Sequence, residues 1–351
     1  MAEKYLTNNP GASIDEAVVL LDASSALIVT DANVDRLVMP ILDESNIVKT
    51  SSKVVITPGE AGKNLDTVVK IWDALEKSGA TRKSVVINIG GVMVTDIGGF
   101  AASTFKRGIA TINFPTTFLG VVDAATGGKT GINFNGFKNE IGTFHEPAKV
   151  IISPLPFSTL PQNELLSGYA EMMKTALISD HELYVKLYRI SDILSNSQEL
   201  GEAVEKCVNI KEEIVKLDPK EEGLRKVLNF GHTAGHAFES IRLERGEPVT
   251  HGEAVAHGML VALILSNIIL DFPSIELNYY HAFLKENYPR PMIGCNDIPD
   301  VLRRMANDKK NSRQGEPSCT LLRQIGEPVV DCHPTLKLIR ESLEIYRDLT
   351  G

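Results

Sequence analysis

The chain has 351 residues, of which 43% are hydrophobic and 23% charged, an ordinary balance for a folded protein long enough for two domains. Its formal net charge of −9 excludes the broad cationic face of a general nucleic-acid-binding protein, and any anionic substrate must therefore meet a local cluster of cations. The four cysteines show no C-x-x-C spacing, and the longest apolar stretch, 259–270, is interrupted by Ser266 and Asn267. With no secretory signal visible, we expect a cytoplasmic protein that binds neither membrane nor nucleic acid.

The first part of the chain alternates short apolar runs with helical spacing. Strands are predicted over 26–30, 53–56, 84–89 and 109–113. Between the second and third of these, residues 65–77 place Val68, Ile71, Trp72 and Leu75 on one stripe with a helical period. Strands that alternate with helices predict βαβ units and a mainly parallel, Rossmann-like sheet.

The pattern changes after Pro154-Leu155-Pro156. Helices are predicted over 164–178, 199–216, 231–243, 253–270 and 336–347, with few strand candidates among them. We therefore expect an α/β fold of two domains, with an α/β domain over 1–158 and a mostly helical domain over 159–351.

A glycine turn follows the predicted strand at 84–89. Gly90-Gly91 leads through Thr95-Asp96 into an Ala-rich helical segment, so that free backbone N–H groups and a helix N-terminus meet at one point, as a pyrophosphate requires. The turn is not a G-x-G-x-x-G fingerprint, and residues 127–130 are not a P-loop. A purely structural tight turn is the alternative, because glycines serve any sharp connection.

Three histidines and a glutamate form a candidate metal site. His232 and His236 stand four residues apart on a predicted helix and so share one face, and His251 opens the next helix. Glu171 lies on an apolar helix, where a carboxylate is costly without a partner. One Glu with two or three His matches a zinc-type site that keeps an open position. The alternative is that His232 and His236 are ordinary surface or core histidines.

Several cations are candidates for binding an anion. Lys129 follows two glycines and Lys174 lies one turn after Glu171, both in stretches that are otherwise small or apolar. Cations that converge on one pocket bind a carboxylate and a phosphate together. Each one is alternatively a solvated surface side chain. The remaining candidates are Lys138, Lys211, Arg225, Lys309 and Lys310.

The order and spacing of these motifs resemble the 3-dehydroquinate synthases. The first series is Gly90-Gly91…Asp96-x-x-Gly99-Phe100, Lys106-Arg107-Gly108-Ile109, Pro115-Thr116-Thr117, Val122-Asp123-x-x-x-Gly127-Gly128-Lys129-Thr130 and Lys138-Asn139-x-Ile141-Gly142. The second is Thr159-Leu160-Pro161, Gly168-x-Ala170-Glu171-x-x-Lys174, Gly223-Leu224-Arg225, Leu228-Asn229-Phe230-Gly231-His232-Thr233-x-Gly235-His236 and His251-Gly252-Glu253. The resemblance runs in order from about residue 30 to about residue 325.

The resemblance implies a residue set for each ligand. The helical domain would bind zinc, or cobalt in its place, through Glu171, His232 and His251. The α/β domain would bind NAD+, with contacts from Asp31, Glu60, Lys63, Gly91, Val92, Asp96, Thr116, Thr117, Asp123, Lys129, Lys138, Thr159 and Glu164. The substrate pocket would comprise Asp123, Lys129, Asn139, Lys174, Lys211, Arg225, Asn229, His236 and Lys309 or Lys310. Arg107 would reach across a homodimer interface into the neighbouring site.

The implied substrate is 3-deoxy-arabino-heptulosonate 7-phosphate, a small sugar acid with a carboxylate and a phosphate. In this family a ring hydroxyl is oxidised by NAD+, phosphate leaves by β-elimination, the hydride returns, and an aldol step closes the ring to 3-dehydroquinate. NAD+ is regenerated, so the implied enzyme is a lyase of the shikimate pathway. The lysines and Arg225 would hold the anionic ends, and His236 would hydrogen-bond a hydroxyl or shuttle a proton.

Three alternative functions stay open from the sequence. Another sugar phosphate cyclase, making a valiolone or a deoxy-inosose, would change several pocket residues, whereas Lys211, Asn229 and His236 keep the dehydroquinate synthase type. A glycerol dehydrogenase-like polyol dehydrogenase would lack the pocket at 127–130 and would use a different ligand set, typically with an Asp. A non-catalytic, ligand-binding descendant is supported only by Val92, where the family usually has glycine.

Overall fold

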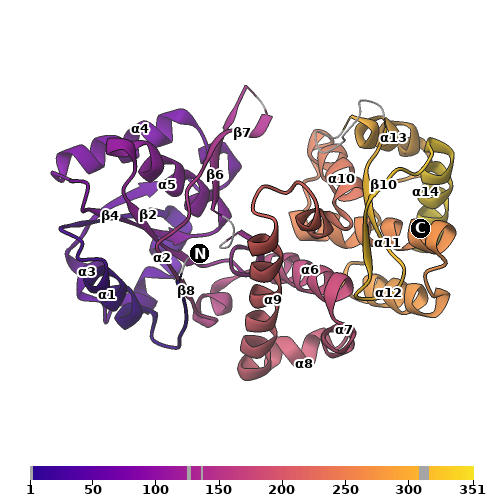
Figure 1. Cartoon of the computed structure of the whole chain (residues 1–351), viewed down its shortest axis with the longest axis horizontal. Helices are drawn as coiled ribbons and strands as arrows, with labels where there is room; N and C mark the ends of the chain where they lie inside the picture. The colour runs from indigo at the N-terminus through magenta and orange to yellow at the C-terminus, as the bar shows by residue number, and fades with distance from the viewer. Residues whose placement is uncertain (1–2, 125–127, 136, 308–315) are drawn as a thin grey trace. The chain divides into compact units, whose positions relative to one another are not determined.

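The computed structural model describes residues 3–124, 128–135, 137–307 and 316–351 (Figure 1). The chain divides into two compact units, Met1–Pro161 and Gln162–Gly351. This division lies just beyond the boundary expected at residue 158. Each unit has its own core and is described by itself.

A six-stranded, fully parallel sheet forms the centre of the first unit, with the strand order β1-β8-β5-β4-β2-β3. The four predicted strands are β2 (Ala26–Asp31), β3 (Ser52–Ile56), β4 (Val85–Gly90) and β5 (Ala110–Pro115). Two strands at one edge were not predicted, β1 (Glu3–Leu6) and β8 (Lys149–Ile152). The predicted parallel α/β sheet is confirmed.

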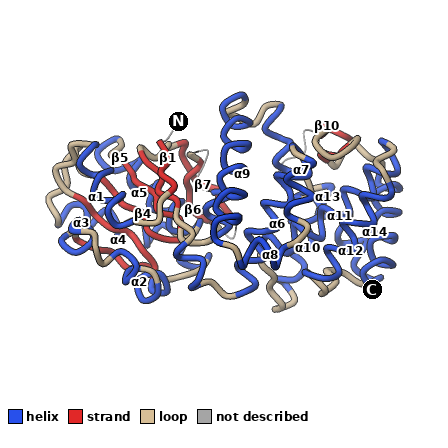
Figure 2. The backbone as a smooth tube through the Cα atoms, turned by 90° about the horizontal axis from the view of Figure 1, so that it is seen from below, coloured by secondary structure: helices blue, strands red, loops and turns tan. Residues whose placement is uncertain are grey.

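Helices cover both faces of this sheet (Figure 2). The inner strands carry apolar side chains on both faces, and the helices bury them in two core clusters. Leu27 and Val29 of β2 pack in the cluster that includes α4 (Leu65–Lys77) and α5 (Val92–Thr104). Ile28 points to the opposite face, where α1 (Pro10–Leu20) and α2 (Ala32–Leu37) complete a second cluster. The strands therefore read as continuous apolar runs rather than alternating ones.

An antiparallel hairpin, β6 (Lys129–Phe134) and β7 (Phe137–Phe144), stands apart from the parallel sheet. Gly131 lies opposite Gly142, and a Cβ on Gly142 would come within 2.3 Å of the Thr130 carbonyl oxygen. Ile132 anchors the hairpin in the core cluster of α4 and α5. The two glycines therefore let these strands pair closely.

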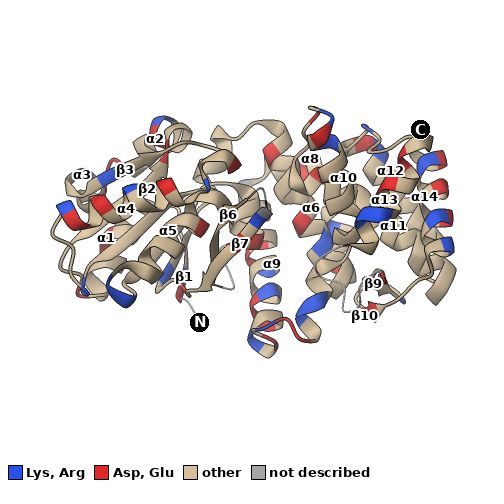
Figure 3. Ribbon diagram, turned by 90° about the horizontal axis from the view of Figure 1, so that it is seen from above, with Lys and Arg blue, Asp and Glu red and all other residues tan. Residues whose placement is uncertain are grey.

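The second unit is mostly helical, as expected. The five predicted helices are α6 (Gln162–Ser179), α9 (Ser197–Leu217), α10 (His232–Glu244), α11 (His251–Leu270) and α14 (Leu336–Thr350). Further helices are α7 (His181–Leu187), α8 (Ile190–Ser195), α12 (Ser274–Asn287) and α13 (Ile298–Ala306), with one small antiparallel pair, β9 (Cys319–Leu322) and β10 (Pro328–Cys332). Acidic and basic side chains are interspersed along α9 and α14 (Figure 3), as on solvated faces of amphipathic helices.

Helix α11 is the central element of the second unit and packs against α6, α10, α12 and α14. Among the described residues it is the one helix long and apolar enough to cross a membrane, with a mean hydropathy of 1.8. However, 72% of that stretch is buried inside the protein. Its composition is therefore that of a core helix surrounded by other helices.

Glycines bring α10 and α11 into close contact. A Cβ on Gly258 would lie 2.1 Å from the Gly231 carbonyl oxygen and 2.7 Å from the Gly235 nitrogen. A Cβ on Gly235 would in turn lie 3.1 Å from the Ala254 carbonyl oxygen. The backbones of the two histidine-bearing helices are thus closer than any side chain at these positions allows.

We expect Gly258→Ala to lower the free energy of unfolding by about 1–3 kcal/mol, because the added methyl forces two packed backbones apart. Urea unfolding followed by circular dichroism measures the loss. The control is Gly201→Ala in α9, where nothing lies within 4 Å of the added Cβ, so stability should hold or rise. Equal stability of Gly258→Ala and the parent would contradict the close packing.

Candidate functional site

The strand register places the ends of four parallel strands at one edge of the sheet. Asp31 of β2 is level with Ile56 of β3, and Gly90 of β4 is level with Pro115 of β5. β2 and β4 are themselves neighbours. Ligands of open parallel sheets bind at this carboxyl edge. The expected NAD+ residues at or just after these ends are Asp31, Glu60, Lys63, Gly91, Val92, Thr116 and Thr117.

The glycine turn at the end of β4 leads directly into α5. Gly91 is the N-cap and Val92 the first helical residue, so the helix begins earlier than expected and includes Asp96. A Cβ on Gly91 would lie 2.8 Å from the Thr117 side chain, which explains a glycine there. Val92 has a helical backbone and needs no glycine. The helix N-terminus at this edge retains the free N–H groups that favour a phosphate.

Hydrogen bonds fix the segments that follow the neighbouring strands. The Asp31 carboxylate caps α2 and accepts from the Asn33 and Val34 backbone N–H groups at 2.8 and 3.1 Å. The Thr116 N–H donates to the Gly90 carbonyl oxygen at 3.0 Å. Thr117 Oγ1 accepts from the Gly120 N–H, also at 3.0 Å. These hydrogen bonds hold the segments at the carboxyl edge of the sheet in place before any ligand binds.

A buried lysine ties this edge to the hairpin. Lys63 is 2% exposed, and its Nζ lies 2.5 Å from both Asp96 Oδ2 and Asn139 Oδ1. Burial raises the pKa of the Asp96 carboxyl, and the charge of Lys63 opposes that shift. Asn133 extends the network, accepting from the Asn139 N–H at 2.9 Å and donating to Glu60 Oε2 at 2.9 Å. One cation, Lys63, therefore joins Asp96 of the predicted cofactor site to Asn139 of the predicted substrate site.

The structure also describes the remaining predicted site residues of the first unit. Asp123 lies in a π-helical turn, Gly120–Ala124, and Lys129 and Lys138 are exposed on the hairpin. Thr159 donates from its hydroxyl to the Pro156 carbonyl oxygen at 2.7 Å. Arg107 is exposed, with a left-handed backbone (φ +70°).

A small pocket in the first unit brings Asn113 and His145, neither of them a predicted site residue, beside two residues that were predicted. It is lined by Thr95, Asp96, Asn113, Gly128, Lys129, Thr130, His145 and Pro147. Burial lowers the pKa of His145, whose buried Nε2 has no hydrogen-bond partner, and Asn113 accepts from Asn88 at 2.8 Å. Neither residue stands in a motif, so only the fold places them beside Asp96 and Lys129.

We expect Lys63→Met to lower the free energy of unfolding by about 3–5 kcal/mol near pH 7, because Asp96 is left as an uncompensated buried charge. The loss should shrink as the pH falls, since without Lys63 the raised pKa of Asp96 rises further and protonation removes the charge. Denaturant unfolding at several pH values measures both effects.

Two variants serve as controls for this prediction. Adding Asp96→Asn to Lys63→Met should recover most of the loss, because the stranded charge is removed. Lys53→Met breaks an ion pair with Asp35 in which the lysine side chain is 38% exposed, and it should cost less than about 1 kcal/mol. A loss for Lys63→Met no greater than for Lys53→Met would contradict the buried pair.

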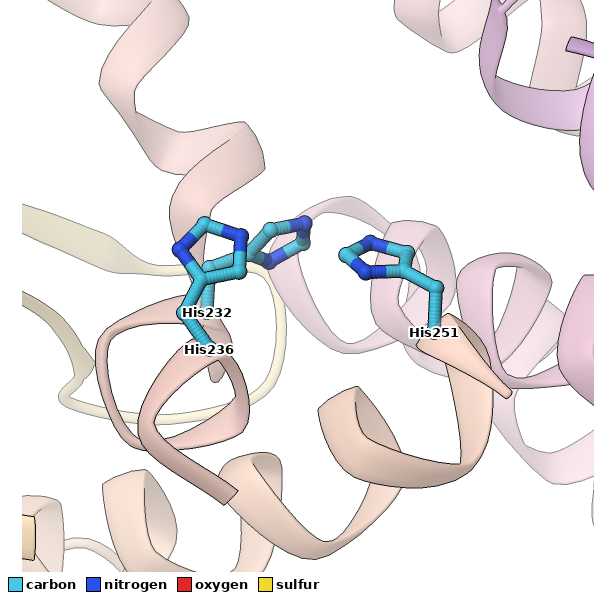
Figure 4. A group of neighbouring side chains, drawn as sticks. All are labelled: His232, His236 and His251. Atoms are coloured by element: carbon cyan, nitrogen blue, oxygen red, sulfur yellow. The ribbon is translucent and has the colours of Figure 1, made fainter. Parts of the chain in front are cut away.

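In the second unit, three imidazoles and one carboxylate converge. Figure 4 shows His232 and His236 on α10 and His251 at the start of α11, with their rings turned toward one another. One ring nitrogen from each lies within 4.8 Å of the others. Glu171, on α6, is 1% exposed, and its Oε1 lies 3.8 Å from Nε2 of both His232 and His251.

This donor set fits a zinc-type ion. Glu171 Oε1 is buried and accepts no hydrogen bond, which is costly for a carboxylate oxygen unless a cation satisfies it. Ligands of one tetrahedral zinc ion are about 3.4 Å apart, close to the 3.8 Å between this oxygen and the two nitrogens. The second carboxylate oxygen forms an ion pair with Lys174.

Local packing explains why these groups meet. Gly231 caps α10 with a left-handed backbone (φ +78°), and a Cβ there would lie 2.5 Å from Met259. At the start of α11, the Gly252 N–H donates to Ser167 Oγ on α6 at 3.0 Å. A Cβ on Gly252 would lie 2.0 Å from the Ser167 carbonyl oxygen. The glycines thus let the two helix starts approach α6, which carries Glu171.

Buried cations accompany this cluster. Lys174, Lys211 and Arg225 are 2%, 6% and 4% exposed, on α6, α9 and the turn before α10, and these elements pack on one another. An Arg225 N–H donates to the Pro219 carbonyl oxygen at 2.8 Å, and Asn229 donates to Glu221 at 2.7 Å. For Lys174, Lys211 and Arg225 this burial contradicts the alternative of solvated surface side chains, whereas Lys129 and Lys138 are exposed.

Three predicted residues remain. Glu164 lies in the first turn of α6, and burial raises its pKa. Lys309 and Lys310 lie outside the described residues.

Comparison with known proteins places the chain in a family. Residues 53–167 match the family model described as 3-dehydroquinate synthase N-terminal, and residues 168–311 match the one described as 3-dehydroquinate synthase C-terminal. The chain belongs to the 3-dehydroquinate synthase family. A 3-dehydroquinate synthase from Parabacteroides distasonis is 43% identical over 324 residues, which cover 92% of each chain. The predicted family membership is confirmed.

Solved structures share the family fold along the whole chain. A 2-epi-5-epi-valiolone synthase from Streptomyces hygroscopicus, with NAD+ and Zn2+ bound, has a TM-score of 0.86 at 26% identity and covers 99% of this chain and 97% of that one. A 2-deoxy-scyllo-inosose synthase, complexed with carbaglucose-6-phosphate, NAD+ and Co2+, has a TM-score of 0.82 at 22% identity, covering 98% and 96%. The predicted two-domain α/β architecture is confirmed.

Proposed function

We propose that this chain is a 3-dehydroquinate synthase, a lyase of the shikimate pathway that converts 3-deoxy-arabino-heptulosonate 7-phosphate to 3-dehydroquinate and phosphate, with NAD+ and zinc or cobalt. The observation that carries the proposal is the buried Glu171 oxygen, which faces two imidazoles beside a buried lysine. The 43% identity to a dehydroquinate synthase, against 26% to a valiolone synthase, favours this function over that of another cyclase.

We propose Glu171, His232 and His251 as the metal ligands. One carboxylate and two imidazoles leave coordination positions open for a substrate hydroxyl. His236, one turn beyond His232 on α10, belongs to the same cluster, but the resemblance to the family implies a substrate contact for it. We assign it instead to the substrate, as a group that hydrogen-bonds a hydroxyl or carries its proton.

The carboxyl edge of the parallel sheet supports NAD+ binding. The start of α5 suits the pyrophosphate, and Asp31, Glu60 and Lys63 near the ends of β2 and β3 suit the adenosine half. Asp96 and the pocket around it suit the nicotinamide half. Helical Val92 does not oppose this assignment, so the reading as a non-catalytic descendant loses its sequence support.

The chain's own side chains would hold the two anionic ends of the substrate. Lys174, Lys211 and Arg225 are already buried and positioned, so little side-chain entropy remains to be lost on binding. When bound, NAD+ and the metal ion supply reversible hydride transfer and polarisation of the reacting hydroxyl. We further propose a cytoplasmic homodimer in which exposed Arg107 reaches the partner's site.

Two single substitutions separate the ligands from the proton carrier. We expect Glu171→Ala to weaken zinc binding by at least about 100-fold, since it removes the charged ligand. His236→Ala should keep zinc affinity near that of the parent but lower kcat by about 100- to 10,000-fold. Chelator competition and phosphate release measure the two effects. Equal loss of zinc in both variants would show instead that His236 is a ligand beside Glu171.

The central proposal is tested by phosphate release from the heptulosonate phosphate. We expect release with zinc and NAD+ present, loss of activity after treatment with chelator, and recovery on adding zinc or cobalt. A sugar phosphate without a carboxylate is the control substrate and should release little phosphate. Absence of release from the heptulosonate phosphate with both cofactors present would overturn the proposed function.

A further inference from the structure

The two ring nitrogens of His251 face two different carboxylates. Its Nε2 lies 3.8 Å from Glu171 Oε1, on the side of the proposed metal ion. Its Nδ1 lies 3.1 Å from Oε2 of Glu239, on α10. An imidazole held in this way can donate its Nδ1 proton to one carboxylate while the Nε2 lone pair points toward the other.

Helix periodicity explains how Glu239 reaches this position. It follows His232 by about two turns and His236 by about one, so all three side chains lie on the same face of α10. Helix α10 therefore carries one proposed ligand itself and also supports the ligand that α11 contributes. The side chains of Glu239 and His251 are only 21% and 28% exposed, which limits competition from water.

The other histidine ligand has an equivalent partner. Nδ1 of His232 lies 3.2 Å from the Phe230 carbonyl oxygen, which can only accept a hydrogen bond. Both proposed histidine ligands thus have an acceptor at Nδ1 and present Nε2 to Glu171. This arrangement favours the neutral Nδ1–H tautomer, which is the form that binds a metal through Nε2.

We propose that Glu239 is a positioning residue of the metal site, which fixes the tautomer and ring orientation of His251 and strengthens Nε2 as a ligand. This inference rests on the proposed metal site. A merely structural role, in which Glu239 joins α10 to α11, would instead lower the stability of the fold without a specific effect on metal affinity.

The test is zinc affinity of the full chain, measured by competition with a chromophoric chelator. We expect Glu239→Ala to weaken zinc binding by about 10- to 100-fold, as loss of a carboxylate behind a ligating histidine does. Glu239→Gln, which keeps an acceptor oxygen but no charge, should show a smaller loss. Thermal unfolding of the metal-free variants separates affinity from stability.

The matched control is Glu244→Gln, at the last residue of the same helix, where the carboxylate pairs with Arg304 on the surface. It removes the same charge and should keep the parent's zinc affinity. Parent-like affinity in both Glu239 variants, with or without a loss of stability, would overturn the inference. If Glu239→Ala does not fold, near-isosteric Glu239→Gln decides alone. A parent chain that binds no zinc would instead overturn the metal site itself.

Discussion

The buried carboxylate of Glu171 is the constraint on which the second unit depends. A carboxylate with 1% exposure is costly without partners, and Lys174 forms an ion pair with one of its two oxygens. The other oxygen needs His232 and His251 on two further helices. Glycines let those helices pack closely: a Cβ on Gly252 would lie 2.0 Å from the Ser167 carbonyl oxygen of α6, and one on Gly258 would lie 2.1 Å from the Gly231 carbonyl oxygen. The glycines that permit this helix packing therefore also bring the proposed metal ligands together.

The first unit meets a similar requirement with a lysine in place of a carboxylate. Parallel pairing brings several strand ends to one edge, but it doesn't position the side chains that follow them. Lys63 does so, because its charge holds Asp96 of α5 and Asn139 of the hairpin together. In both units a buried charged side chain faces groups from elements distant in sequence. Buried ion pairs add little net stability, but they make alternative arrangements costly.

How much the sequence reveals depends on whether the signal is local. The strand at 84–89 was predicted because burial on both faces makes it continuously apolar. β1 was missed because Glu3 and Lys4 interrupt any such run, and its partner β8 lies far along the chain. The start of α5 was placed too late along the chain, because Val92 begins an apolar run that is typical of a strand. Motif residues such as His232 were selected because their spacing is itself helical.

The proposed role of Glu239 shows why part of the candidate site is not predicted from the sequence. Its helical spacing from His232 was available in the sequence, but glutamates on helix surfaces are common and usually solvated. What distinguishes it is a contact with His251, which exists only after α10 and α11 have packed. The proposed metal ligands can be predicted from motifs, because a zinc-type ion binds particular donor atoms. The groups behind these ligands need only supply a hydrogen-bond acceptor at the right place. A backbone carbonyl does so for His232 and a carboxylate does so for His251, so no fixed residue type marks such a group in the sequence.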